Sequence, residues 1–181
     1  MIVLMGMKHC GKTTLGRMLA EREGRVFIDL DGYAEALVSR QRGCPLTLRE
    51  IYRDEGREAF QALEAESLAC LMADYPEDGR RAVLALGGGT IENPEALAAF
   101  TGSCLFIYLE EDEDVLFRRI QASGIPPFLA GDDPRGAFHL LYEKRTALYR
   151  GKADLTIHTG GKNPGEILED IASRGETRYA C

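Results

Sequence analysis

The stretch GMKHCGKTTLGRML, residues 6–19, decides the fold of this chain. It follows the short apolar run MIVLM, residues 1–5, which is typical of a buried strand. The apolar residues after it recur at helical spacing, so we predict a helix over Thr13–Glu23. Between the two lies the pattern Gly-x-x-x-x-Gly-Lys-Thr, which begins at Gly6. A strand, a glycine-flanked loop and a helix in this order indicate an α/β protein with a phosphate-binding loop.

The loop has the residue types that phosphate binding requires. Gly6 and Gly11 let the backbone curl so that successive N–H groups point inward at a helix N-terminus, which is partly positive. Lys12 is expected to reach the terminal phosphates, with Thr14 beside it, and the Thr13 hydroxyl is expected to bind Mg²⁺. Because the flanking strand and helix are the ones the motif needs, we predict an ATP site rather than a chance glycine-lysine turn.

Two further loop positions carry side chains with chemistry of their own. We interpret His9 and Cys10 as spacers rather than catalysts, although a thiol beside Lys12 could be acidic and open to oxidation. The chain has an odd number of widely spaced cysteines without a CxxC pair, which predicts free thiols in a reducing cytoplasm. These cysteines are Cys10, Cys44, Cys70, Cys104 and Cys181.

Bulk properties limit the class of protein. A chain of 181 residues predicts one domain with a real core, over 1–181. The net charge of -7 argues against a general nucleic-acid or membrane-surface binder, which would carry a basic face. No apolar run approaches the roughly 20 residues that span a bilayer, and no signal peptide is evident. We expect a cytoplasmic monomer that binds a small anionic ligand.

Strand and helix patterns alternate along the chain. This alternation predicts a parallel sheet of five strands with helices on both faces. The expected strands are 1–5, 25–31, 82–89, 104–110 and 153–159. The expected helices are 13–23, 32–42, 48–73 with a break at YRDEG, one beginning at NPEALAAF, 111–120, 136–149 and one in NPGEILEDIASR.

Asp29 and Asp31 lie two residues apart in FIDLDGY, at the expected end of the second strand. Strand periodicity would point both side chains to the same side, at the sheet edge where ligands bind in open parallel sheets. One carboxylate near Mg²⁺ and one near a substrate hydroxyl would serve phosphoryl transfer. The alternative is a helix N-cap followed by a solvated aspartate.

A run of three glycines, Gly87, Gly88 and Gly89, ends the third expected strand in LALGGGTIENP. Glycines allow the backbone to approach a ligand closely, although a loose turn is the simpler interpretation. At this point the chain resembles the shikimate kinases, P-loop small-molecule kinases of the nucleoside-monophosphate-kinase-like fold. The resemblance covers nearly the whole chain and depends on the phosphate loop together with DLD, DEGREAFQALE, LGGGTI, FRRI, PPFLAG, YEKRTALY and KNPGEI.

The resemblance implies a role for each matching residue. Asp29 would bind the metal, whereas Asp31 would bind the substrate hydroxyls and act as base. Arg145 would bind the substrate carboxylate; the alternative is an ordinary surface cation. The substrate pocket would be lined by Gly87, Gly88, Gly89 and the residue at position 61, and the adenine ring would be bordered by Arg119, Lys162 and Pro164. Substrate-binding helices would span about 32–73 and a mobile lid about 122–136.

Two positions depart from the family pattern. Gln61 stands where the family has a second arginine for the substrate carboxylate, and Pro126 stands where the lid has an arginine. A neutral amide cannot replace a bidentate cation, and proline offers no donor. Arg57, one helical turn before Gln61, could compensate at the first position, and Arg135 could compensate in the lid. For both, an ordinary exposed arginine is the simpler interpretation.

Three functions therefore remain open. The first is ATP- and Mg²⁺-dependent phosphorylation of shikimate to shikimate 3-phosphate, in aromatic amino acid biosynthesis. The second is a related kinase for another hydroxy acid, sugar acid or hydroxy amino acid, which Gln61 and Pro126 favour. The third is a nucleotide-binding regulator without catalysis, which the presence of Lys12, Asp29 and Asp31 disfavours. A protein kinase is not expected, because HRD and DFG elements are absent from the sequence.

Overall fold

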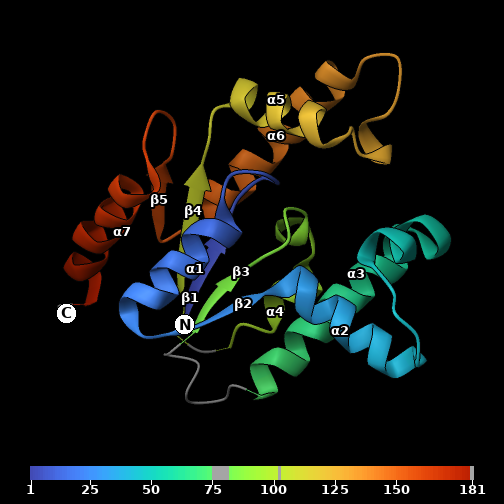
Figure 1. Ribbon diagram of the computed structural model, residues 1–181, viewed down its shortest axis with the longest axis horizontal. Coiled ribbons are helices and arrows are strands. Elements are labelled where there is room, and N and C mark those ends of the chain that lie inside the picture. The colour runs from blue at the N-terminus through green and yellow to red at the C-terminus, as the bar shows by residue number, and fades with distance from the viewer. Residues whose placement is uncertain (75–81, 102, 180–181) are drawn as a thin grey trace.

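The computed structural model describes residues 1–74, 82–101 and 103–179. Over these ranges the chain forms a five-stranded parallel sheet, as predicted, and its strand order is β2-β3-β1-β4-β5 (Figure 1). The strands are β1 (Ile2–Met5), β2 (Val26–Asp29), β3 (Ala82–Ala85), β4 (Leu105–Glu110) and β5 (Leu155–His158). The helices are α1 (Lys12–Glu23), α2 (Leu30–Arg42), α3 (Leu48–Asp74), η2 (Thr90–Glu92), α4 (Pro94–Ala98), α5 (Glu113–Ser123), η3 (Pro127–Leu129), α6 (Pro134–Lys152) and α7 (Pro164–Tyr179).

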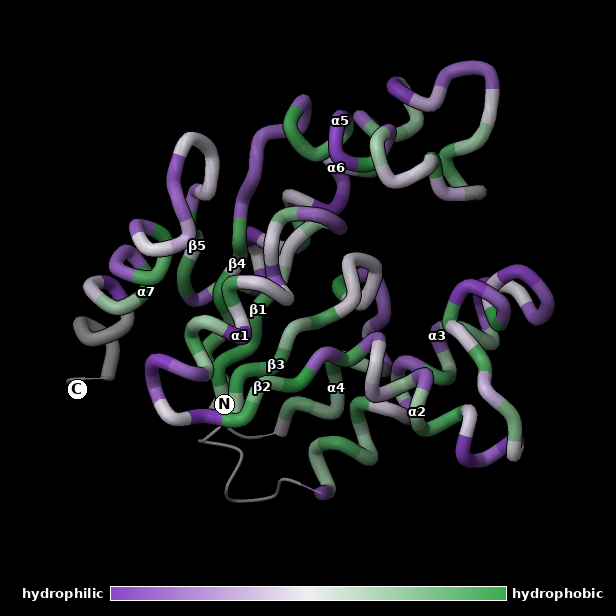
Figure 2. The backbone as a smooth tube through the Cα atoms, in the orientation of Figure 1, coloured by the Kyte–Doolittle hydropathy of each residue, from purple (hydrophilic) through white to green (hydrophobic). Residues whose placement is uncertain are grey.

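Helices cover both faces of the sheet. Strands β1, β3 and β4 are buried along their whole length and form an apolar band through the molecule (Figure 2). On one face, Leu4 of β1 meets α1 at Gly16. On the other, the Tyr108 ring of β4 stacks on Tyr149 of α6 at 4.9 Å. Because Leu4 pairs with Ile107, the neighbour of Tyr108, side-chain alternation puts α1 and α6 on opposite faces.

The end of the second strand differs from the prediction. Strand β2 stops at Asp29, and both Leu30 and Asp31 belong to α2. The Asp29 side chain caps this helix, since its Oδ1 accepts a hydrogen bond from the backbone N–H of Asp31 at 3.2 Å. The strand periodicity that we expected across Asp29 and Asp31 is therefore wrong, because an N-capping aspartate begins the helix two residues earlier.

Helices α2 and α3 pack against each other and form a separate apolar cluster beside the sheet (Figure 1). The predicted break in the long helix is confirmed at Gly56, where φ is +86° and the helix kinks. A positive φ is open to glycine without a steric penalty. The residues of the cluster are Ala34, Val38, Leu48, Ile51 and Leu63.

The segment predicted as a lid connects α5 to α6. Gly124 ends α5 with a φ of +95°, and Asp133 caps α6 by accepting the Gly136 N–H at 2.8 Å. Between them, Leu129 is buried in the core, whereas Phe128 is 52% exposed. The segment is therefore anchored at one apolar point. In the part of the chain that is described, no helix is long and apolar enough to cross a bilayer.

Candidate active site

The loop between β1 and α1 has the backbone of a phosphate cradle. Gly6, His9 and Gly11 all have positive φ, at +150°, +69° and +99°. A Cβ on Gly6 would lie 2.7 Å from the carbonyl oxygen of Leu109, so glycine is required there for steric reasons as well. The turn closes with a hydrogen bond from Cys10 N–H to Met7 O at 3.2 Å and leads directly into α1.

Lys12 lies folded over this loop. Its Nζ donates to the carbonyl oxygens of Gly6 at 2.8 Å and Met7 at 3.0 Å. Its ammonium is thereby held above the cradle without a carboxylate partner among the described residues. Cys10 is buried, with Sγ 3.9 Å from Lys12 Nζ, and this burial shields the thiol from dissolved oxidants. Cys10, Cys44, Cys70 and Cys104 are free thiols, and Cys181 lies outside the described residues.

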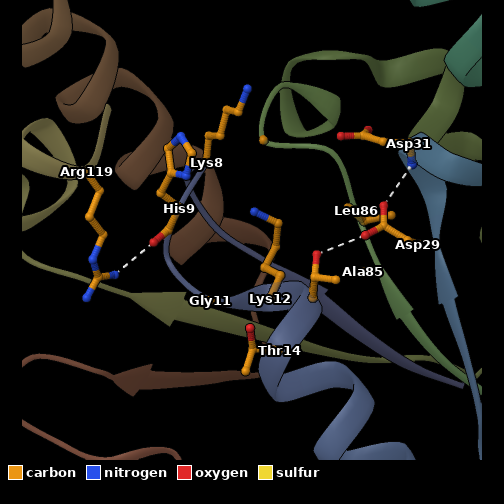
Figure 3. A pocket seen from close by; sticks show the side chains of 12 residues that line it. Lys8, His9, Gly11, Lys12, Thr14, Asp29, Asp31, Ala85, Leu86 and Arg119 are labelled. Carbon is orange, nitrogen blue, oxygen red and sulfur yellow. Dashed lines mark hydrogen bonds between the residues drawn. The ribbon is translucent and has the colours of Figure 1, made fainter. Parts of the chain in front are cut away.

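The two aspartates line the same pocket as the loop, despite the change in local structure. Thr13 Oγ1 donates to Asp29 Oδ2 at 2.9 Å, and Thr14 also lines the pocket (Figure 3). Partial burial and then the neighbouring Asp29 carboxylate raise the pKa of Asp31, against the opposing charge of Lys12. The pocket has a volume of about 540 Å³.

Gly87, the first of the three glycines, lies where two carboxylates converge. A Cβ added there would stand 2.7 Å from Asp31 Oδ1 and 3.2 Å from Glu64 Oε1. Glu64 is buried and accepts hydrogen bonds from Thr90 Oγ1 at 2.6 Å and Asn93 Nδ2 at 3.3 Å. Burial raises the pKa of Glu64 in spite of these donors. The glycine turn is therefore a close approach between backbone and carboxylates rather than a loose turn.

Helix α6 faces the rest of the glycine turn. The Tyr149 hydroxyl donates to Gly88 O at 2.7 Å, and a Cβ on Gly89 would lie 3.4 Å from Arg145 Nη2. Arg145 is held by Glu92, whose Oε2 accepts from Nε at 2.9 Å and from Nη2 at 2.7 Å. The Glu92 side chain is only 8% exposed. Arg145 is thus a fixed, largely buried cation beside the pocket and not an ordinary surface arginine.

Arg119 lies on the other side of the phosphate loop. Its Nη1 donates to His9 O at 2.8 Å (Figure 3). Its Nη2 lies 3.1 Å from Glu111 Oε2. Burial, followed by the charges of Lys8, Lys12 and Arg119, lowers the pKa of His9. The positive potential around the loop is the physical cause of that charge effect.

The loop between β5 and α7 approaches the same region. A Cβ on Gly160 would lie 3.0 Å from Asp112 Oδ2 and 3.5 Å from Glu111 Oε1. The loop therefore packs on the segment that carries the Glu111 partner of Arg119. Lys162 donates to Asp170 Oδ2 at 2.6 Å, and Pro164 is the first residue of α7.

The arginines considered as replacements lie away from the pocket lining. Arg135 pairs with Glu113 at 2.9 Å and Asp114 at 2.7 Å. Arg57 is exposed and makes no ion pair or hydrogen bond with the described residues. Gln61 is half-buried on α3, and its backbone carbonyl accepts from Asn93 Nδ2 at 2.8 Å. In this arrangement neither arginine compensates for Gln61 or Pro126.

Sequence reasoning missed Lys8, Glu92 and Tyr149. Lys8 occupies a free position of the loop motif, and the residue type alone could have marked it as a cation beside phosphate. Glu92 contacts Arg145 and Tyr149 contacts Gly88, and these partners are 53 and 61 residues apart in the sequence. No local pattern signals such contacts.

Comparison with known proteins identifies the family. The sequence model of the family "Shikimate kinase" matches residues 8–175. The chain belongs to the shikimate kinase family. The shikimate kinase of Mycobacterium marinum is 34% identical over 95% of this chain and 87% of its own length. That of Symbiobacterium thermophilum is 35% identical over 97% of this chain and 98% of its own length.

A solved shikimate kinase also matches the structure. The enzyme from Acinetobacter baumannii, in complex with shikimate, superposes with a TM-score of 0.81 at 28% identity. The match covers 98% of this chain and 93% of that one. The family membership and the parallel five-stranded fold predicted from the sequence are thus confirmed.

Proposed function

We propose that this protein transfers the terminal phosphoryl group of ATP to a hydroxyl of shikimate, in a Mg²⁺-dependent reaction that gives shikimate 3-phosphate. The observation that carries the proposal is the glycine turn at residues 87–89. It is flanked by Asp31 and Glu64 at one end and by Arg145 at the other, and it faces the phosphate loop. A base for a hydroxyl and a cation for a carboxylate are what shikimate, a hydroxylated carboxylate, requires.

The phosphate loop fits ATP and Mg²⁺ by the chemistry of its donors. Lys12 and the N-terminus of α1 supply the positive charge that triphosphate oxygens need, with Gly6, Gly11 and Thr14 forming the cradle. Thr13 Oγ1 and Asp29 Oδ2, 2.9 Å apart, are a hydroxyl and a carboxylate oxygen, which suit Mg²⁺. Among the described residues no larger group of acidic, His or Cys side chains could hold a metal. Mg²⁺ shared with phosphates needs only one or two protein ligands.

Asp31 is the base in this proposal. Its raised pKa moves it toward the range in which a carboxylate can take a proton from a hydroxyl as the bond to phosphorus forms. Magnesium, when bound, neutralises phosphate charge and aligns the phosphates. The residues themselves contribute position: Gly87 brings backbone close to Asp31, and Arg145 orients the acceptor through its carboxylate.

The remaining roles follow from position. We assign Gly88, Gly89 and Gln61 to the acceptor pocket, within a substrate-binding region of helices over about 32–73. We assign Arg119, Lys162 and Pro164 to the adenine ring. Residues 122–136 are proposed to close as a lid, which would exclude water and so limit wasteful hydrolysis of ATP. The protein is proposed to act as a cytoplasmic monomer.

Shikimate is favoured over other acceptors because the relatives above are named shikimate kinases over nearly their full length. Gln61 and Pro126 remain departures from the family pattern. With a single arginine for the carboxylate, we expect a higher KM for shikimate than a two-arginine site would give, since a charge-assisted hydrogen bond contributes roughly 1.5–3 kcal/mol.

The test is acceptor-dependent ADP release by the purified protein with ATP and Mg²⁺. Shikimate, gluconate, homoserine and serine are compared with a blank that lacks an acceptor, and the phosphorylated product is identified by mass. We expect turnover with shikimate and little with the other acceptors. Turnover with gluconate alone would reject shikimate as the substrate, and ATP binding without turnover on any acceptor would reject catalysis.

A further inference from the structure

Three cations line the pocket, and two of them are engaged. Lys12 donates to the loop carbonyls of Gly6 and Met7. Arg119 is held by Glu111 and by His9 O. Lys8 is exposed, and its side chain makes no ion pair or hydrogen bond with any described residue. Of these three cations, Lys8 is thus the one without a partner among the residues that the structure describes.

The proposed lid supplies no such cation. Arg135 is the one basic residue in the sequence from 122 to 136, which also contains Asp132 and Asp133. Its guanidinium pairs with Glu113 and Asp114 and lies 5.0 Å from the centre of the Phe117 ring. Arg135 is therefore held against α5 by two carboxylates and an aromatic ring of that helix. Pro126 adds no charge.

The backbone of Lys8 is packed against the glycine turn. A Cβ on Gly88 would lie 3.0 Å from the backbone nitrogen of Lys8, so the glycine turn packs directly on the main chain of the loop. Figure 3 shows the Lys8 side chain extending outward from the loop, and both Lys8 and Lys12 line the pocket. The Cα of Lys8 thus stands between the phosphate cradle and the turn that flanks Asp31.

We propose that Lys8 binds the transferred phosphoryl group, as a further catalytic residue of this kinase. The inference rests on the proposed phosphoryl transfer from ATP. Phosphoryl transfer spreads negative charge over the outer phosphate oxygens, and catalysis depends on fixed positive groups around them. Lys12 is folded onto the loop carbonyls, and Lys8 supplies a second ammonium in a pocket to which the lid offers no free cation.

Lys8 is not altered chemically during the phosphoryl transfer. The acceptor oxygen forms a bond to the terminal phosphorus, the bond from that phosphorus to the bridging oxygen breaks, and ADP leaves with the electron pair. The hydroxyl proton passes to Asp31. Lys8 remains an ammonium throughout and neither gives nor takes a proton.

The test compares Lys8→Met, Lys8→Arg and the control Lys152→Met. Lys152 lies over the Phe106 ring near the amino end of β4, at the opposite edge of the sheet from the pocket. Steady-state kinetics use ATP, Mg²⁺ and shikimate. Calorimetry measures the binding of ATP and ADP separately, without acceptor, and thermal unfolding checks that each variant is folded.

We expect Lys8→Met to lower kcat by about 100-fold, near the lower end of the loss on removing one donor to a developing charge. ATP should bind about 10-fold more weakly, while ADP binding is unchanged, because ADP lacks the terminal phosphate. Lys8→Arg should restore most of the kcat and most of the ATP affinity. Lys152→Met should match the wild type in both quantities.

Wild-type kcat and ATP affinity in folded Lys8→Met would overturn the inference. An equal loss of ATP and ADP affinity would also overturn it, because Lys8 would then act on the whole nucleotide. Failure of the proposed function looks different. The wild-type protein would show no acceptor-dependent ADP release. In calorimetry, however, Lys8→Met would still weaken the binding of ATP and leave the binding of ADP unchanged.

Discussion

Arg145 and Glu92 form a two-point ion pair across the glycine turn, with Nε and Nη2 of the arginine 2.9 and 2.7 Å from one carboxylate oxygen. Lys144 binds the other oxygen of Glu92 at 2.6 Å. The carboxylate therefore fixes the guanidinium beside Gly89 and balances part of its charge. The same carboxylate is also a competitor for any acidic substrate that uses Arg145.

Replacing Glu92 with glutamine should destabilise the protein in a pH-dependent manner. Burial alone would raise the pKa of Glu92, but the hydrogen bonds from Lys144 and Arg145 bring it below the ordinary value. A depressed pKa means that the carboxylate adds stability above the ordinary glutamate range and loses it as the pH falls through the folded pKa. We expect Glu92→Gln to unfold about 1–3 kcal/mol more easily at pH 7, measured with urea.

Glu95→Gln, at an exposed position on α4, is the matched control and should behave as the wild type. The difference between Glu92→Gln and the wild type should shrink below the ordinary glutamate range, where both side chains are neutral. A deficit that stayed constant as the pH fell below that range and through the depressed pKa of Glu92 would contradict the charge argument.

Much of the fold was predictable because it depends on local patterns. Apolar runs that are buried on both faces mark β1, β3 and β4, and the loop motif locates the phosphate cradle. The glycine in YRDEG marks the kink in α3, which comes from its positive φ. The error at Asp29 arose because an aspartate can either lie within a strand or cap a helix. Here it caps α2, which begins two residues earlier than predicted.

The site was predictable only in part. Lys12, Thr13 and Asp31 were found because they lie within motifs, and they line one pocket. The partners of Arg145 and Arg135 were not predictable, because Glu92 and Glu113 reach them through tertiary packing of α6. A candidate arginine in a sequence can therefore be free or already paired, and only the fold distinguishes the two.

Asp31→Asn should remove the proposed base. We expect kcat to fall by about 10²–10⁴-fold, the usual contribution of general acid–base catalysis. Because the pKa of Asp31 is raised, the acid limb of the wild-type pH–rate profile should lie above the ordinary aspartate range. The limb should disappear in the variant.

The measurement is kcat/KM for shikimate across pH, with Asp54→Asn as the control. Asp54 is exposed and pairs with Arg53 at the surface of α3, where an ion pair contributes little. An acid limb that persists unchanged in Asp31→Asn would assign the titration to another group.

Thr13→Val should weaken the response to magnesium. The Thr13 hydroxyl donates to Asp29 at 2.9 Å, and valine keeps the shape of the side chain but removes the oxygen. We expect the Mg²⁺ concentration for half-maximal rate to rise by about 10-fold or more, the order of effect seen when a group supporting a metal site is lost. Thr13→Ser retains the hydroxyl and should stay near the wild type. Equal Mg²⁺ dependence in Thr13→Val would exclude this hydroxyl from the metal site.

Gly16→Ala should destabilise the fold without touching the pocket. A Cβ at Gly16 would overlap the Phe27 ring and lie 3.2 Å from Cδ1 of Leu4, because α1 packs tightly on β1 and β2 there. Overpacking of this kind costs about 1–3 kcal/mol. Gly151→Ala is the matched control, since its Cβ would meet nothing within 4 Å and alanine favours the helix by roughly 0.5–1 kcal/mol. Urea unfolding should therefore shift in opposite directions for the two variants. A Gly16→Ala protein as stable as the wild type would mean that the helix can move away from the sheet at little cost.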